Sequence, residues 1–143
     1  MTWFKSVGWV ASCALISVGL RWWLGQGAQD WMAPEVSRPT SLDPNALHVF
    51  LTQLPWQAHA ARLAGHALGL AVATVFLTVN APCARRDSFA FGALMGLGVA
   101  FDMWRVPHPA LWTALAFATT AATMGLSFRV GLRIRKTQDE TSI

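Results

Sequence analysis

The chain carries little charge, no tyrosine and only two cysteines, Cys13 and Cys83. Charged residues make up 13% of the 143 residues, against about 25% in a typical soluble domain. A disordered chain would be more polar, a disulfide scaffold would hold more cysteine, and a coiled coil would show charged heptads. The composition therefore excludes these three classes.

Hydrophobic residues make up 54% of the chain, with eight Trp and eight Phe. This composition is typical of an integral membrane protein, and we predict an all-α, polytopic bundle of four transmembrane helices within residues 1–128. A polar cytoplasmic tail, 129–143, follows the bundle. At about 1.5 Å per residue, the first apolar segment reaches roughly 33 Å, which is enough to cross the hydrocarbon core. The predicted spans are residues 3–24, 56–80, 88–104 and 110–128.

The first segment also resembles a cleaved signal peptide. Arg21, Trp22 and Trp23 stand where the small residues of a cleavage site should be. We therefore expect this helix to be retained in the protein.

Residues 25–55 are predicted to form an outer loop. Pro34, Pro39 and Pro44 exclude a continuous helix in its first part. Residues 45–54 repeat apolar side chains at helical spacing, with Asp43 placed to cap a helix there. This helix is too short to span a membrane. We expect it to lie on the membrane surface or to pack over the mouth of the bundle.

The basic residues border the apolar segments, which indicates topology rather than nucleic-acid binding. The side with more of them should face the cytoplasm, so we predict a bacterial inner-membrane protein with both termini cytoplasmic. A belt of tryptophans near the outer boundary agrees with this orientation. The cytoplasmic set is Lys5, Arg85, Arg86, Arg129, Arg133, Arg135 and Lys136; the outer set is Arg21, Arg38, Arg62 and Arg105.

Three polar residues, His59, Arg62 and His66, share one stripe of the second predicted span. His66 lies about 15 Å along the helix from Trp56, near the middle of the membrane. Such a stripe can form a proton or solute path, or hold a cofactor. The favoured interpretation is structural, with a neutral His66 bonded to another helix and Arg62 extended toward the interface.

Asp102 is the only carboxylate inside a predicted span. A desolvated carboxylate needs a cationic partner. Two partners fit: Arg62 on another helix, which can offer a two-pronged contact, and Arg105 on the same helix. The sequence does not separate these alternatives.

A haem site is disfavoured. His59 and His66 are about 10 Å apart along one helix, so they cannot ligate the same iron, and His108 lies in a surface turn. A pigment held through His66 alone is the remaining cofactor hypothesis. We expect no metal, no cofactor and no enzymatic activity, because the sequence lacks the GxSxG, HExxH and phosphate-loop motifs.

Two GxxxG patterns, Gly65/Gly69 and Gly92/Gly96, allow helix backbones to approach closely. We expect them to pack the second and third spans together, and as an alternative to form an oligomer face.

The segments "AHAARLAGHALGLAVATVFLT" and "FGALMGLGVAFDMWRVPHPALW" resemble a family of small bacterial four-helix membrane proteins of unknown function. The matching positions are His66 to Gly69, and Pro107 to Pro109 followed by Trp112. The resemblance covers about residues 58–131; the first helix and the Pro-rich loop match poorly, and Asp102 lies outside the pattern. It implies the four-helix topology and no activity.

Three functions fit the sequence. The first is a structural or accessory component that acts through helix contacts, as a homo-oligomer or within a larger membrane complex. The second is a small oligomeric carrier or channel that uses His66, Arg62 and Asp102. The third is a pigment- or haem-binding membrane protein. The lipid bilayer is a partner in all three, and nucleic acid in none.

Overall fold

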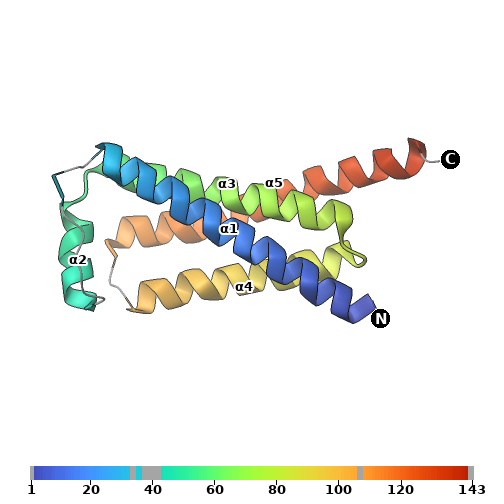
Figure 1. Cartoon of the computed structure of the whole chain (residues 1–143), viewed down its shortest axis with the longest axis horizontal. Coiled ribbons are helices and arrows are strands. Elements are labelled where there is room, and N and C mark those ends of the chain that lie inside the picture. Colours follow the sequence, from blue (N-terminus) through green and yellow to red (C-terminus); the bar gives the residue numbers. More distant parts are fainter. Residues whose placement is uncertain (1, 33–34, 37–42, 106–107, 142–143) are drawn as a thin grey trace.

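The computed structural model describes residues 2–32, 35–36, 43–105 and 108–141 (Figure 1). Within these ranges the chain is helical and contains no strand, which confirms the all-α class. The five helices are α1 (Thr2–Met32), α2 (Pro44–Gln53), α3 (Trp56–Asn80), α4 (Ala84–Arg105) and α5 (Ala110–Thr141).

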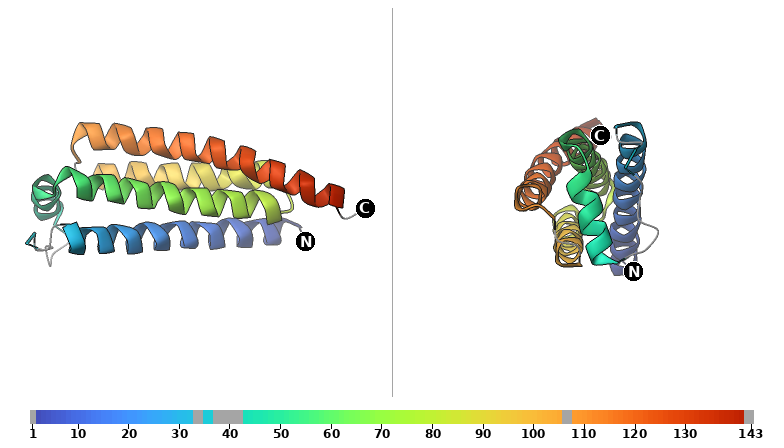
Figure 2. Two further views of the ribbon diagram at one scale, coloured as in Figure 1. Left: turned by 90° about the horizontal axis from the view of Figure 1, so that it is seen from above. Right: turned by 90° about the vertical axis from the view of Figure 1, so that its left-hand side faces the viewer.

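The four long helices lie side by side, and α2 crosses one end of the bundle (Figure 2). Both chain termini lie toward the opposite end. Helix α3 is central, because it contacts α1, α4 and α5. The larger buried cluster surrounds the half of α3 that leads to α4, residues 69–80, which we call its inner half; the cluster includes Cys13, Leu70, Leu77 and Phe91.

Three helices are long and apolar enough to cross a membrane: Trp3–Gly27, Trp56–Asn80 and Ala110–Glu140. Among the described residues, three of the four predicted membrane-spanning segments therefore meet this criterion, and the segment in α4 does not. Helix α4 has 22 residues, but charged residues occupy both of its ends and lower its apolar character. They are Arg85, Arg86 and Asp87 at its start, and Asp102 and Arg105 at its end.

Two helices continue beyond the ends of the predicted spans. Helix α1 continues to Met32 instead of ending near residue 24, since no proline interrupts the chain before Pro34. Helix α5 continues to Thr141, so residues 129–141 extend the last helix instead of forming a separate tail. Side chains such as Arg, Lys and Gln favour helix there. Helix α3 has the predicted bounds.

Helix α2 begins as the sequence indicates. The Asp43 carboxylate accepts a hydrogen bond of 3.2 Å from the Ala46 amide, and Pro44 occupies the first turn. Phe50, Leu51 and Leu54 are buried against Ala58 of α3. Of the two positions expected for this helix, the structure shows the one over the mouth of the bundle. The predicted loop residues Pro34, Pro39 and Arg38, and Pro107 of the Pro-His-Pro turn, lie outside the described residues.

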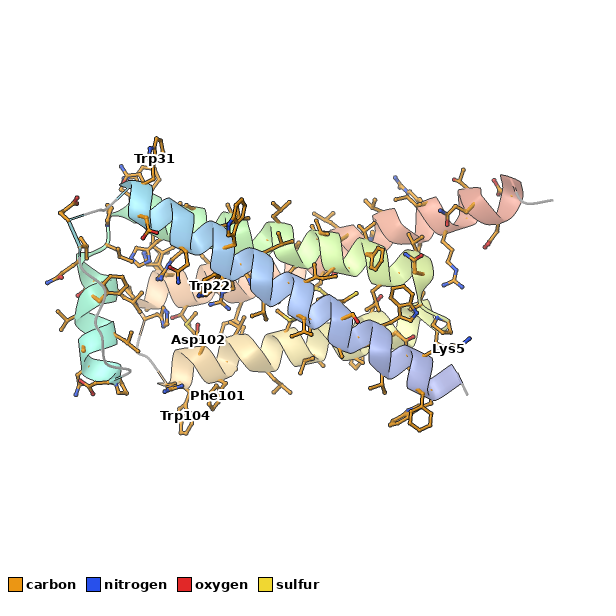
Figure 3. All side chains as sticks on the ribbon, viewed as in Figure 1. Lys5, Trp22, Trp31, Phe101, Asp102 and Trp104 are labelled. Atoms are coloured by element: carbon orange, nitrogen blue, oxygen red, sulfur yellow. The ribbon has the colours of Figure 1, made fainter. Side chains whose placement is uncertain are left out.

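The two ends of the bundle differ in composition (Figure 3). Trp31 and Trp104 lie toward the α2 end, each with 81% of its surface exposed. Lys5 lies at the opposite end, where the connection between α3 and α4 brings Arg85 and Arg86. We call these the aromatic end and the basic end.

Candidate functional site

His66 projects from α3 toward α5 and is 3% exposed. Its Nε2 lies 2.9 Å from the hydroxyl oxygen of Thr120. The Thr120 hydroxyl donates its own hydrogen to the Ala116 carbonyl at 2.7 Å. The hydroxyl oxygen must therefore accept from His66, which places the imidazole hydrogen on Nε2. The other ring nitrogen, Nδ1, carries a lone pair in this tautomer.

The Nδ1 of His66 is buried without a hydrogen-bond partner. One other buried side-chain atom shares this state in the described part of the chain, the hydroxyl oxygen of Ser17 on α1. Ser17 packs against Gly69, one helical turn from His66. Buried polar atoms are normally paired, so these two unpaired atoms make the region a candidate functional site.

Arg21 of α1 and Asp102 of α4 form an ion pair with a distance of 2.9 Å between Nη2 and Oδ2. Asp102 projects from α4 toward α1 (Figure 3). Both predicted pairings of Asp102, with Arg62 and with Arg105, are therefore wrong. The side chains of Arg21 and Asp102 are 39% and 41% exposed, so the pair lies at the edge of the bundle and contributes little stability in itself.

Arg21 was missed because the sequence places it close to the end of the first apolar segment. Because α1 continues to Met32, Arg21 lies well before the end of the helix, one turn from Ser17. Both Arg21 and Asp102 interact electrostatically with His66. Four helices thus contribute to one polar cluster, which consists of Ser17, Arg21, His66, Asp102 and Thr120.

The residues of the predicted stripe contact different helices: His59 and Arg62 contact α2, and His66 contacts α5. His59 donates from Nε2 to the Leu51 carbonyl of α2 at 3.0 Å and stacks on Trp112 at 4.9 Å between ring centres. The guanidinium carbon of Arg62 lies 6.0 Å from the centre of the Phe50 ring. The last carbonyls of α2 have no partners within the helix, and His59 supplies one of them with a donor. Together with Arg62, which contacts the Phe50 ring, it holds α2 over the end of the bundle. His66 alone belongs to the polar cluster.

Gly65 and Gly69 lie at a close helix contact, but the partner is α1 and not α4 as expected. A Cβ at Gly69 would lie 2.7 Å from the Ser17 carbonyl oxygen, and one at Gly65 would lie 2.9 Å from Leu24 Cβ. Gly92 faces the end of Met124 on α5 at 3.0 Å, while Gly96 faces open space. The second GxxxG pattern therefore joins no two backbones within this chain.

Sequence reasoning missed a further contact glycine, Gly131. A Cβ there would lie 2.7 Å from Thr78 Cβ, so Gly131 lets α5 approach the inner half of α3. No GxxxG partner signals this position, because Gly131 follows Gly125 by six residues.

Among the described residues, cavities that are open to the surface lie at both ends of the bundle. One, at the basic end, is lined by Arg85, Arg86 and Arg135, among others. The other, at the aromatic end, is lined by Trp31, Glu35 and Gln53, among others. Neither cavity includes a residue of the polar cluster. The cluster can therefore bond helices to one another and exchange a proton at Nδ1, but these cavities do not give it a solute chamber.

The chain matches no family model, no curated protein and no solved structure. The resemblance of residues 58–131 to small four-helix membrane proteins stays a prediction.

Proposed function

We propose that this protein is a non-catalytic structural or accessory component of a bacterial inner membrane and acts through helix contacts within the bilayer. In this proposal all four long helices cross the membrane, with α4 included because it packs beside α1, α3 and α5. The basic end faces the cytoplasm, as does each terminus, and α2 lies outside. The described residues support this orientation, because Trp31 and Trp104 lie opposite Lys5.

The observation that carries the proposal is the contrast between the inside and the outside of the bundle. Side chains that are costly in lipid pair with other helices of the same chain: His66 pairs with Thr120 inside the bundle, and Arg21 pairs with Asp102 at its edge. Outside, the faces are apolar. Leu15 of α1, Leu97 of α4 and Leu126 of α5 are 75%, 70% and 64% exposed.

Several glycines on these outer faces have free space above them. A Cβ added at Gly19 of α1, Gly96 of α4 or Gly125 of α5 would meet no atom within 4 Å. In lipid, small residues of this kind let another helix come close. These positions therefore offer contact surfaces to a second protein or a second copy.

Leucine substitution of the open glycines tests the proposal. Gly96→Leu and Gly125→Leu should leave the fold intact, since a Cβ at either position meets no atom of the chain within 4 Å. One of them should remove the partner that co-purifies with the native protein in mild detergent, as measured by native mass spectrometry. Gly19→Leu is the third test variant and examines the outer face of α1 in the same way. A protein that is monomeric, without a partner before and after each substitution, would contradict the accessory role.

A small proton-coupled carrier is the second candidate, favoured by the unpaired Nδ1 of His66. A buried imidazole nitrogen with no partner is placed to accept a proton. His66→Gln keeps a donor for Thr120 but removes the titratable ring. Loss of proton flux into liposomes in His66→Gln, with thermal stability retained, would support the carrier. A flux of zero in the native protein would contradict it.

A further inference from the structure

The cavity at the basic end is a pocket open to the surface, with a volume of about 480 Å³, where α5 passes the connection between α3 and α4. Three arginines are among the residues that line it: Arg85, Arg86 and Arg135. Leu132 and Pro82 give it an apolar wall. The cavity thus combines a strong positive charge with a hydrophobic surface, at the level where the bundle would leave the membrane.

Two of the three arginines are held in place by the fold. Arg135 donates from Nη1 to the Ala81 carbonyl at 2.9 Å and caps the end of α3. Arg86 donates from Nε to Asp87 at 3.1 Å and from Nη2 to the Ser6 hydroxyl at 2.7 Å. Because these contacts fix the two side chains, little conformational entropy is lost when their remaining N–H groups bind a ligand.

The third arginine, Arg85, is exposed and has no polar partner in the described ranges. Asp87, next to Arg86 in the chain, is a nearby carboxylate and is already bonded to Arg86 and to the Cys83 amide. The charge of three arginines and one aspartate leaves an excess of two positive charges. The first turn of α4, residues 84–86, adds backbone N–H groups without helical acceptors.

Arginine side chains beside a helix N-terminus suit an oxyanion with several acceptor oxygens. A phosphate group meets this need better than a carboxylate, since it offers oxygens in more than two directions. The apolar wall of Leu132 and Pro82 suits a ligand that also carries a glycerol or acyl portion. Anionic phospholipids have both parts and gather at basic pockets between transmembrane helices.

We propose that this cavity binds a phosphate-bearing anion, supplied by the headgroup of an anionic phospholipid in the leaflet at the basic end. The proposal rests on the membrane placement proposed above, and it is independent of the accessory role.

Arg85→Gln is the decisive variant, because Arg85 makes no polar contact that the fold needs. Arg133→Gln is the matched control, since it removes one exposed positive charge at the same end without touching the cavity. Each protein, purified in neutral detergent, is titrated with phosphatidylglycerol and, separately, with phosphatidylcholine. Binding is measured by native mass spectrometry and by the rise in unfolding temperature.

The native protein and Arg133→Gln should bind phosphatidylglycerol in preference to phosphatidylcholine. Arg85→Gln should bind phosphatidylglycerol roughly fivefold more weakly, the effect expected of one basic residue facing an anionic lipid. No preference between the two lipids, or equal weakening by Arg85→Gln and Arg133→Gln, would overturn the site.

Inorganic phosphate distinguishes the two sources of the ligand. If phosphate alone raises the unfolding temperature as much as the lipid does, and Arg85→Gln removes that rise, the site is supported and its ligand comes from solution. Neither result depends on whether a protein partner co-purifies, so failure of this proposal and failure of the accessory role are separate outcomes.

Discussion

The two halves of α3 join their neighbours in different ways. The outer half, which follows α2 in the chain, uses two histidine side chains, and each bonds to a different helix. His59 bonds to α2 and His66 bonds to α5. The inner half uses hydroxyl groups. Thr78 donates to the Thr74 carbonyl at 2.7 Å and lies 3.0 Å from the Ser88 hydroxyl oxygen.

The difference shows two solutions to the same problem. A threonine can bond its hydroxyl to its own helix, so its neighbours need only come close, and small residues such as Gly131 allow that. A histidine cannot bond within its own helix in this way and depends on a partner at a defined place. We therefore expect the inner half to be sensitive to added volume and the outer half to be sensitive to loss of a single polar group.

The largest effect should come from added volume in the inner half. Gly131→Ala places a Cβ 2.7 Å from the branched Cβ of buried Thr78, and should lower the free energy of unfolding by about 2 kcal/mol. Gly125→Ala, on the same helix with open space above it, is the control and should change it little. Thermal unfolding in detergent measures both. Equal stability of the two variants would show that the inner half of α3 is not sensitive to added volume.

The second effect concerns His66. Thr120→Val keeps the volume of the side chain but leaves the His66 N–H without an acceptor. It should cost about 1 kcal/mol, as interhelical hydrogen bonds in membranes do. Thr119→Val, at the preceding position of α5, is the control, because it removes a hydroxyl that does not bond to His66. Urea or detergent unfolding of the two variants, compared with the native protein, gives the difference.

The ion pair should contribute less, because both of its side chains are partly exposed. A double-mutant cycle of Arg21→Gln and Asp102→Asn should give a coupling energy of about 0.5 kcal/mol, which falls as salt concentration rises. The same cycle with Arg62→Gln should give none. Coupling of Asp102 to Arg62 instead would restore the pairing expected from the sequence and refute the one described.

The smallest effect on global stability should come from His59. His59→Ala removes the donor to the Leu51 carbonyl, so α2 should open more often while the four long helices stay folded. The loss of one hydrogen bond of about 1 kcal/mol corresponds to roughly fivefold faster exchange of the α2 amide hydrogens. Hydrogen exchange followed by mass spectrometry resolves α2 from the bundle. Exchange that accelerates equally in α5 would show that His59 stabilises the whole fold.

Much of the secondary structure follows from the sequence. The bounds of α3 are visible because Pro55 precedes the apolar run and Pro82 follows it. The cap of α2 is visible in Asp43 and Pro44. The ends of α1 and α5 are not visible, since the apolar run stops before the helix does. Residues beyond the run still favour helix, and hydrophobicity does not mark where a helix ends in water.

The candidate site is less accessible to such reasoning. His66 is recognisable as a polar residue at depth, but its partner Thr120 is one of several threonines on α5. The pairing of Asp102 with Arg21 depends on which faces of α1 and α4 meet. Depth along each helix, which the sequence supplies, points to Arg62 as the partner on another helix, but it does not show which helix faces meet.

The amino-acid sequence by itself determines that this chain forms long apolar helices, and roughly where each begins, because these properties depend on residues close together along the chain. The tertiary structure alone decides that α1 packs on Gly65 and Gly69, that Arg21 meets Asp102, and that Arg85 joins Arg86 and Arg135 at one cavity. The physical reason is rotation about the helix axis. Spacing along one helix defines its own faces, but only the packing of whole helices selects which faces touch.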